Sequence, residues 1–97
     1  FAIHHLPDAR KQDLYHEVFA RLRPGGIFAN LEHVSSVNAE RHVRFLHAVG
    51  YTRATEDAEN KLAPVASQPA WLREAGFTHV DCHWKWLELA LLVGLKP

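Results

Sequence analysis

The clearest change in the hydrophobic pattern of this chain falls within residues 22–33. An amphipathic run stops at Pro24, which has no backbone N–H and disfavours helical angles in the residue before it. Two glycines then permit a sharp reversal of the backbone. An apolar segment suited to a buried strand follows, and polarity returns at Glu32 and His33. The pattern predicts a central parallel strand, Ile27 to Leu31, buried on both faces, flanked by helices and ending at a functional edge.

The start of the chain predicts the end of an earlier strand. Phe1 to Ile3 are apolar, and His4 and His5 form a polar exit before a proline turn. A helix is predicted over Asp8–Arg23, with the Asp8 carboxylate as a cap. Its apolar stripe is Leu14, Tyr15, Val18, Phe19 and Leu22, and its other face, expected to be solvated, carries Arg10, Lys11, Asp13, Glu17 and Arg21.

Two more helices are predicted after the central strand. Capping side chains precede an apolar stripe over Ala39–Val49, and Gly50 is placed to end or kink this helix. Tyr51–Ala66 has no clean period and predicts a short helix or an ordered loop. Gln68–Gly76 places proline near a helix start and glycine just after its end.

The last segment alternates in polarity and predicts a β-hairpin. Alternation over 77–84 and the apolar run 87–93 favour two strands joined near Trp84-Lys85-Trp86 over one long helix, although Trp86–Leu92 alone has helical character. A helix over Leu87–Val93 would refute this interpretation.

Composition limits the class of protein. The chain has 97 residues, which predicts one domain, 1–97, with 11 basic and 11 acidic side chains. Balanced charge gives no support for nucleic-acid or anionic-membrane binding. Cys82 is the sole cysteine, and no apolar run reaches the length of a membrane span, so a reducing, cytoplasmic setting is expected.

The order of motifs resembles a known family. The exit Ala2-Ile3-His4-His5-Leu6, the turn Leu22-Arg23-Pro24-Gly25-Gly26 and the segment Trp71-Leu72-Arg73-Glu74-Ala75-Gly76-Phe77 before a closing hairpin resemble the C-terminal half of class I S-adenosylmethionine-dependent methyltransferases. The resemblance implies an α/β fold, a partial Rossmann-like sheet made of the fourth to seventh strands. The sheet is expected to be parallel, with a C-terminal antiparallel hairpin whose last strand is inserted between the fifth and sixth.

The resemblance also implies a cofactor and a site. S-adenosylmethionine would run beside Phe1, Ala2, Ile3 and His4, and a small-molecule methyl acceptor would lie under the segment 39–66. The family's glycine-rich turn after the first strand and the acidic residue closing the second are missing from this sequence. The chain alone is therefore expected to be inactive.

Polar residues at the two strand exits are the candidate catalytic groups. Methyl transfer needs orientation and sometimes a base, and His4, His5, Glu32 and His33 lie where such groups act. Structural alternatives remain open, namely turn histidines and a capping or solvated pair. The spacing of the histidines does not predict a metal site.

Two further expectations concern association. The alternative function is a non-catalytic α/β module that self-associates or docks on another chain. An unpaired strand edge at Phe1–His4 predicts a homo-oligomer, most simply a two-fold dimer.

Overall fold

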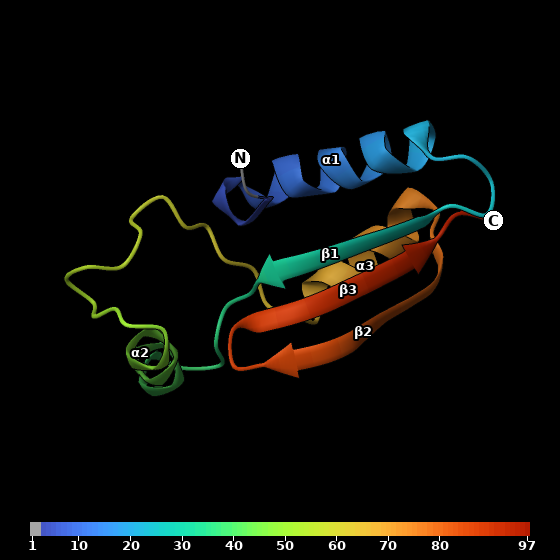
Figure 1. The fold of residues 1–97 in the computed structure, drawn as a ribbon. Coiled ribbons are helices and arrows are strands. Elements are labelled where there is room, and N and C mark those ends of the chain that lie inside the picture. Colours follow the sequence, from blue (N-terminus) through green and yellow to red (C-terminus); the bar gives the residue numbers. More distant parts are fainter. Residues whose placement is uncertain (1–2) are drawn as a thin grey trace.

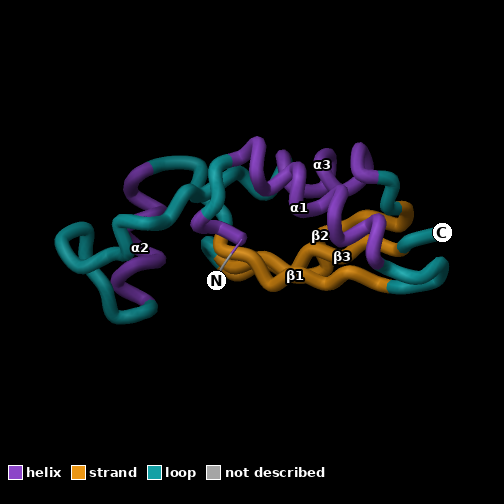
Figure 2. The backbone as a smooth tube through the Cα atoms, turned by 90° about the horizontal axis from the view of Figure 1, so that it is seen from above, coloured by secondary structure: helices purple, strands orange, loops and turns teal. Residues whose placement is uncertain are grey.

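The fold is a three-stranded sheet with helices on one face and a helix and loop beyond one end. The computed structural model describes residues 3–97. Helices α1 and α3 lie on the same side of the sheet, and α2 with the following loop extends past the end of β1 (Figures 1 and 2). The elements are the 3₁₀ helix η1 (Ile3–His5), α1 (Asp8–Arg21), β1 (Ile27–His33), α2 (Ala39–Ala48), α3 (Ser67–Ala75), β2 (Thr78–Trp86) and β3 (Leu89–Leu95).

The strand order is β1-β3-β2, and β3 is antiparallel to both neighbours. The prediction that the last strand is inserted antiparallel between the two before it is therefore confirmed, as is the closing hairpin. The turn lies at Leu87 and Glu88, just beyond the predicted Trp84–Trp86 junction. Leu87 has a φ of 51°, a left-handed conformation that is uncommon for a residue other than glycine.

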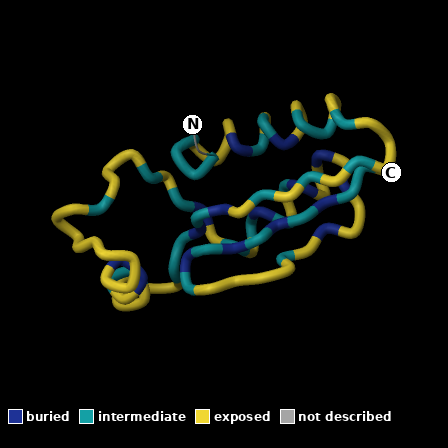
Figure 3. The backbone as a smooth tube through the Cα atoms, in the orientation of Figure 1, coloured by how far each residue is buried: buried dark blue, intermediate teal, exposed yellow. Residues whose placement is uncertain are grey.

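The prediction that β1 is buried on both faces and flanked by helices is wrong. Phe28 faces the helices, whereas Ile27 and Leu31 on the other face are 63% and 64% exposed. Burial alternates along β1 because the helices of the described residues cover only one face of the sheet (Figures 2 and 3). The apolar composition of the strand indicated burial, but whether both faces or only one face is buried depends on which helices cover the sheet.

The core lies between α1, α3 and the covered face of the sheet. Phe19 meets Phe77 edge-on, with ring centroids 5.1 Å apart, and Tyr15 is fully buried and donates a hydrogen bond to Gln68. The buried apolar cluster consists of Tyr15, Val34, Leu72, Ala75, Phe77, Val80, Ala90 and Leu92.

Two predictions about the polar side of α1 are wrong. Lys11 is fully buried, because its ammonium group donates to the backbone carbonyl of Lys61 and lies 3.3 Å from the Asp8 carboxylate. Asp8 does not cap the helix: Pro7 occupies the N-cap position without a side-chain hydrogen bond. A buried ammonium needs such partners, and Lys61 is too distant in sequence to be recognised from the helical pattern.

The other helix boundaries follow the local sequence signals. Asn38 caps α2 by accepting from the Arg41 N–H at 2.9 Å, and α3 ends at Gly76, which is left-handed. In the predicted turn, Gly25 has a φ of 84° and its N–H donates to the Lys96 carbonyl at 2.7 Å. The segment Tyr51–Ala66 contains no helix or strand longer than an isolated bridge, and is an ordered loop.

The predicted strand at Phe1–Ile3 is wrong at Ile3, which belongs to η1; Phe1 and Ala2 lie outside the described residues. Within residues 3–97 no helix combines the length and apolar character needed to cross a bilayer.

Replacing Gly76 by alanine tests how closely the end of α3 packs against Phe19 of α1. A Cβ there would lie 2.8 Å from the Phe19 ring, and the φ of 115° is unfavourable for alanine. Gly50 has a φ of 90°, but a Cβ at this position would meet no atom within 4 Å, so Gly50→Ala carries backbone strain alone. In urea unfolding we expect Gly50→Ala to lose about 1 kcal/mol and Gly76→Ala about 3 kcal/mol, because the latter adds overpacking. Equal losses would contradict the close contact.

Candidate functional site

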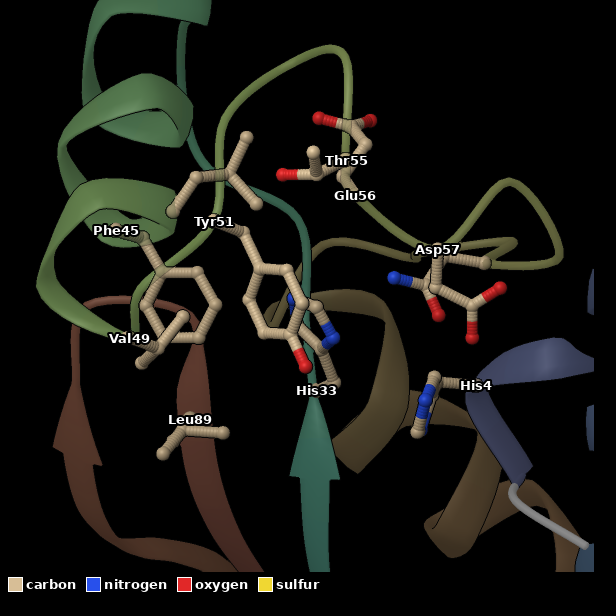
Figure 4. A pocket seen from close by; sticks show the side chains of 11 residues that line it. His4, His33, Phe45, Val49, Tyr51, Thr55, Glu56, Asp57 and Leu89 are labelled. Atoms are coloured by element: carbon tan, nitrogen blue, oxygen red, sulfur yellow. The ribbon is translucent and has the colours of Figure 1, made fainter.

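A cavity lies where β1 ends and α2 with its following loop begins to cover the sheet edge. Its volume is about 350 Å³. Figure 4 shows His4 on one side and His33, Phe45 and Tyr51 on the other. The wall comprises His4 of η1, His33 of β1, Phe45, Leu46 and Val49 at α2, Tyr51, Thr55, Glu56, Asp57 and Asn60 of the loop, and Leu89 of β3.

His4 reaches this cavity from η1. Its Nδ1 lies 3.4 Å from Glu32 Oε1, and its ring centroid lies 5.3 Å from that of His33. Burial lowers the pKa of His4 from its ordinary value, and the neighbouring His33 and His5 lower it further. His4 is therefore neutral at neutral pH and has a lone pair available.

His33 ends β1 and turns into the same cavity. Its Nε2 lies 2.8 Å from Glu88 Oε1, and its ring packs 5.1 Å from Phe45 between centroids. Its own backbone N–H donates to Glu32 at 3.1 Å. The ring is thus held by one polar and one aromatic neighbour.

Glu88 is a fully buried carboxylate in the turn between β2 and β3. It accepts hydrogen bonds from His33, from the Ser36 hydroxyl and from His42 Nδ1, the last at 2.8 Å. Burial alone would raise the pKa of Glu88, but these three hydrogen bonds outweigh it and the pKa is lowered. Glu88 is therefore ionised at neutral pH.

His42 links α2 to this carboxylate and to the loop. Its Nε2 lies 2.9 Å from Glu56 Oε2, so both ring nitrogens face carboxylates. Burial lowers the pKa of His42, but the hydrogen bonds to Glu88 and Glu56 outweigh burial and the net pKa is raised. Arg53 also approaches Glu56, with Nε 3.4 Å from Oε2.

Of the predicted site residues, Glu32 lies behind the cavity. Its carboxyl is 1% exposed, with Asn30 Nδ2 3.4 Å away. Burial raises the pKa of Glu32, and its hydrogen bonds from the His33 N–H and Asn30 only partly oppose this. Glu32 supports His4 and His33 instead of lining the cavity wall.

His5 lies outside the cavity wall and connects η1 to the loop. Its Nε2 lies 2.9 Å from Asp57 Oδ2. The pKa of Asp57 is lowered, chiefly by the backbone N–H of Glu59 and also by His5. Of the predicted cofactor residues, Ile3 packs against the core and His4 lines the cavity, while Phe1 and Ala2 lie outside the described residues.

Sequence reasoning missed Glu88, His42, Ser36 and Glu56. Glu88 stands in an apolar segment, and a charged residue in such a segment is the one signal that could have indicated it. The sequence gives no signal for His42, because helical spacing does not reveal a partner on a distant hairpin turn. Among residues 3–97 no three histidine, cysteine, aspartate or glutamate side chains are arranged to hold a metal ion.

A second cavity of about 410 Å³ is lined in part by residues 35–37, which follow β1. Arg41 and Lys85 give it a basic lining, and it contains none of the predicted site residues.

Comparisons with known proteins show which fold the chain shares. No family model matches it. It is 28% identical over 102 residues to the carboxy-S-adenosyl-L-methionine synthase of Desulforapulum autotrophicum, covering 91% of the chain and 41% of that protein. The chain thus spans about two-fifths of the curated relative.

Two solved structures share its architecture. The S-adenosylmethionine-dependent methyltransferase SibL in its apo form gives a TM-score of 0.69 at 18% identity, over 95% of the chain and 28% of SibL. A possible exported protein from Bordetella parapertussis gives 0.73 at 24% identity, over 100% of the chain and 36% of that protein. The predicted partial Rossmann-like methyltransferase fold is confirmed.

The raised pKa of His42 predicts a pH-dependent contribution to stability. His42→Asn keeps a hydrogen-bond donor near the position of Nδ1 but does not titrate. Because the folded pKa lies above the ordinary 6.5, protonated His42 stabilises the fold fully below pH 6.5, and this contribution is lost as the pH rises through the folded pKa. Urea unfolding should show the wild type exceeding the variant most in mildly acidic buffer, with the excess shrinking in mildly alkaline buffer. A pH-independent difference would contradict the assignment.

Proposed function

We propose that this chain forms the acceptor-binding part of an S-adenosylmethionine-dependent methyltransferase that acts on a small molecule. The observation that carries the proposal is the cavity at the end of β1, where His4 of η1 and His33 of β1 meet beside α2 and its loop. In open α/β sheets ligands bind outside the carboxyl ends of the strands, which is where this cavity lies.

The comparisons support S-adenosylmethionine as the methyl donor. The names of the curated relative and of SibL both contain it, and the shared fold covers nearly the whole chain. The glycine-rich turn that would hold most of the cofactor is not in this sequence. The chain would then contribute one wall of a complete site, and alone it would not transfer methyl groups.

The cavity walls suit the chemistry of methyl transfer. The reaction depends chiefly on in-line orientation of the acceptor, and a base that takes its proton adds roughly 10²–10⁴-fold. His4, with its lowered pKa, and His33 are the groups that face the cavity. His5 is held by Asp57 at its rim, and Glu32 supports the two cavity histidines from behind.

The charge of the cavity favours an uncharged or cationic acceptor. Among the described residues its wall contains Glu56 and Asp57 but no lysine or arginine. An acceptor with a carboxylate or phosphate at this position would meet two acidic side chains and no lysine or arginine of the wall. Phe45 and Tyr51 add aromatic surface for a flat or cationic group.

The proposal also covers how the protein associates and where in the cell it acts. The three strands leave one edge of β1 unpaired within the described residues, so we propose that this edge, next to η1, pairs in a homo-oligomer or with a further strand. Balanced charge gives no reason to expect a nucleic-acid partner. The single cysteine suits a cytoplasmic setting.

The alternative is a non-catalytic module that self-associates or docks on another chain. Calorimetry with S-adenosylhomocysteine distinguishes the two, using a protein that joins this chain to a glycine-rich cofactor-binding half. We expect micromolar binding by that protein and none by the chain alone. Absence of binding by the longer protein would favour the non-catalytic module.

Blocking the cavity tests where the acceptor binds. In the longer protein, Val49→Trp would fill the cavity under α2, whereas Val37→Trp would enter the second, basic cavity. With methyl-labelled S-adenosylmethionine and a pool of neutral and amine-bearing small molecules, we expect Val49→Trp to reduce transfer at least 10²-fold, since lost positioning has effects of that order. Val37→Trp should stay within about 3-fold, and S-adenosylhomocysteine binding should be unchanged in both. A selective loss in Val37→Trp would move the acceptor site to the second cavity.

A further inference from the structure

Glu88 is a charged side chain where an apolar one would be expected. It is fully buried at a hairpin turn, between the apolar strand β3 and the end of β1. Replacing a buried charged group by a well-packed apolar one is often neutral or stabilising, so stability alone does not account for a carboxylate here. Its contacts point to a role at the cavity.

We propose that Glu88 is a positioning residue that fixes His33 as the Nε2–H tautomer, so that His33 Nδ1 takes the proton of the methyl acceptor. This inference rests on the proposed function, because it assigns the base of that reaction. The proposal selects His33 from the candidate histidines and adds Glu88 from the turn between β2 and β3.

The two carboxylate oxygens of Glu88 have different partners. Oε1 faces His33 Nε2 at 2.8 Å, whereas Oε2 accepts from the Ser36 hydroxyl and faces His42 Nδ1 at 2.8 Å. An ionised carboxylate can only accept hydrogen bonds, so His33 Nε2 must carry the hydrogen. His33 Nδ1 is then an acceptor, and within residues 3–97 it has no hydrogen-bond partner.

The contacts of Glu88 Oε2 fix the orientation of the carboxylate toward His33. Ser36 follows β1, and His42 lies on α2, so the carboxylate is held from two directions other than that of His33. His42 is in turn held by Glu56 at 2.9 Å. The His33 ring is confined on its other sides by Phe45 and His4, at 5.1 and 5.3 Å between centroids.

The other histidines lack this arrangement. His5 pairs with Asp57, which is about half exposed, and lies outside the cavity wall. His4 approaches Glu32 at only 3.4 Å, and the pKa of Glu32 is raised by burial, so this carboxyl is less suited to stabilise an imidazolium. His33 combines a cavity position with an ionised partner whose own pKa is lowered.

The proposed reaction is a direct transfer of the methyl group from sulfur to the acceptor. The acceptor's lone pair forms a bond to the methyl carbon, the sulfur–methyl bond breaks, and its electron pair stays on sulfur, which loses its positive charge. The acceptor's proton moves to His33 Nδ1, so the positive charge passes to an imidazolium whose Nε2–H donates to Glu88.

Imidazole ¹⁵N spectra of the chain test the tautomer without any methyl-transfer assay. When the pH is raised until the His33 signals no longer change, wild-type His33 should show the Nε2–H pattern alone. Glu88→Gln keeps the shape of the side chain but offers one acceptor to three donors, so His33 should become a mixture of tautomers. Glu56→Gln is the matched control: it weakens the contacts of Glu56 with His42 and Arg53, leaves Glu88 in place and should leave the His33 pattern unchanged.

Two outcomes overturn the proposal. An Nδ1–H tautomer in wild-type His33 does so even if Glu88→Gln fails to fold, and so does an unchanged single tautomer in a folded Glu88→Gln variant. If the tautomer is as expected but the longer protein fails to bind S-adenosylhomocysteine, the positioning stands and the proposed function falls.

Kinetics of the longer protein then connect positioning to transfer. We expect Glu88→Gln to lower kcat roughly 10²-fold with KM within about 3-fold, because loss of general-base assistance has effects of this order. Asn38→Ala removes the side-chain cap of α2, lies outside the cavity wall and should keep kcat within about 3-fold. Equal losses in both variants would show that the network only holds α2 in place, and would refute the positioning role.

Discussion

The structure depends on the position of β3 between two strands that both run antiparallel to it. The register pairs Leu89 with His33 on one side and with Trp86 on the other, so the hairpin turn lies at the same level as the end of β1. The Val34 N–H donates to the Glu88 carbonyl at 2.8 Å, which continues the alignment past the last strand residue. Because of this register, a turn residue far along the chain supplies the carboxylate that meets His33 and His42.

Local signals predicted the helices and the hairpin, whereas the contacts of charged side chains could not be predicted. Pro24, Gly25 and Gly76 act through their own backbone preferences, which sequence reveals directly. Lys11 is buried with a hydrogen-bond partner 50 residues away in sequence, and the partners of Glu88 are 46 or more residues away. No periodicity in the sequence identifies such partners. The predicted site residues His4 and His33 both line the cavity, although His4 lies in η1 and not after a strand, and the network behind them depends on the fold.

The prediction that β1 is buried on both faces failed because burial, too, depends on parts of the structure that are distant in sequence. Ile27 and Leu31 are as apolar as residues of a strand covered on both faces, yet one face of the sheet is open in the described residues. The chain spans about two-fifths of its curated relative, and 28% and 36% of the two solved structures with this fold. We infer that the sequence of β1 is suited to a larger assembly of layers, in which its apolar outer face and unpaired edge would both be covered.

The two buried carboxyl groups at this end of the sheet have pKa values that move in opposite directions. Burial acts on both carboxyl groups. Glu88 receives three side-chain hydrogen bonds, one of them from His42, whose own pKa is raised. Glu32 receives one hydrogen bond from a backbone N–H and one from an amide. The three donors to Glu88 outweigh the effect of burial on its pKa, whereas the two donors to Glu32 do not. Pairs of titratable groups separated in this way are a mark of acid–base sites. His33 lies between them, since its backbone N–H donates to Glu32 and its Nε2 faces Glu88, and the proposed base thus stands between two carboxyl groups whose pKa values move apart.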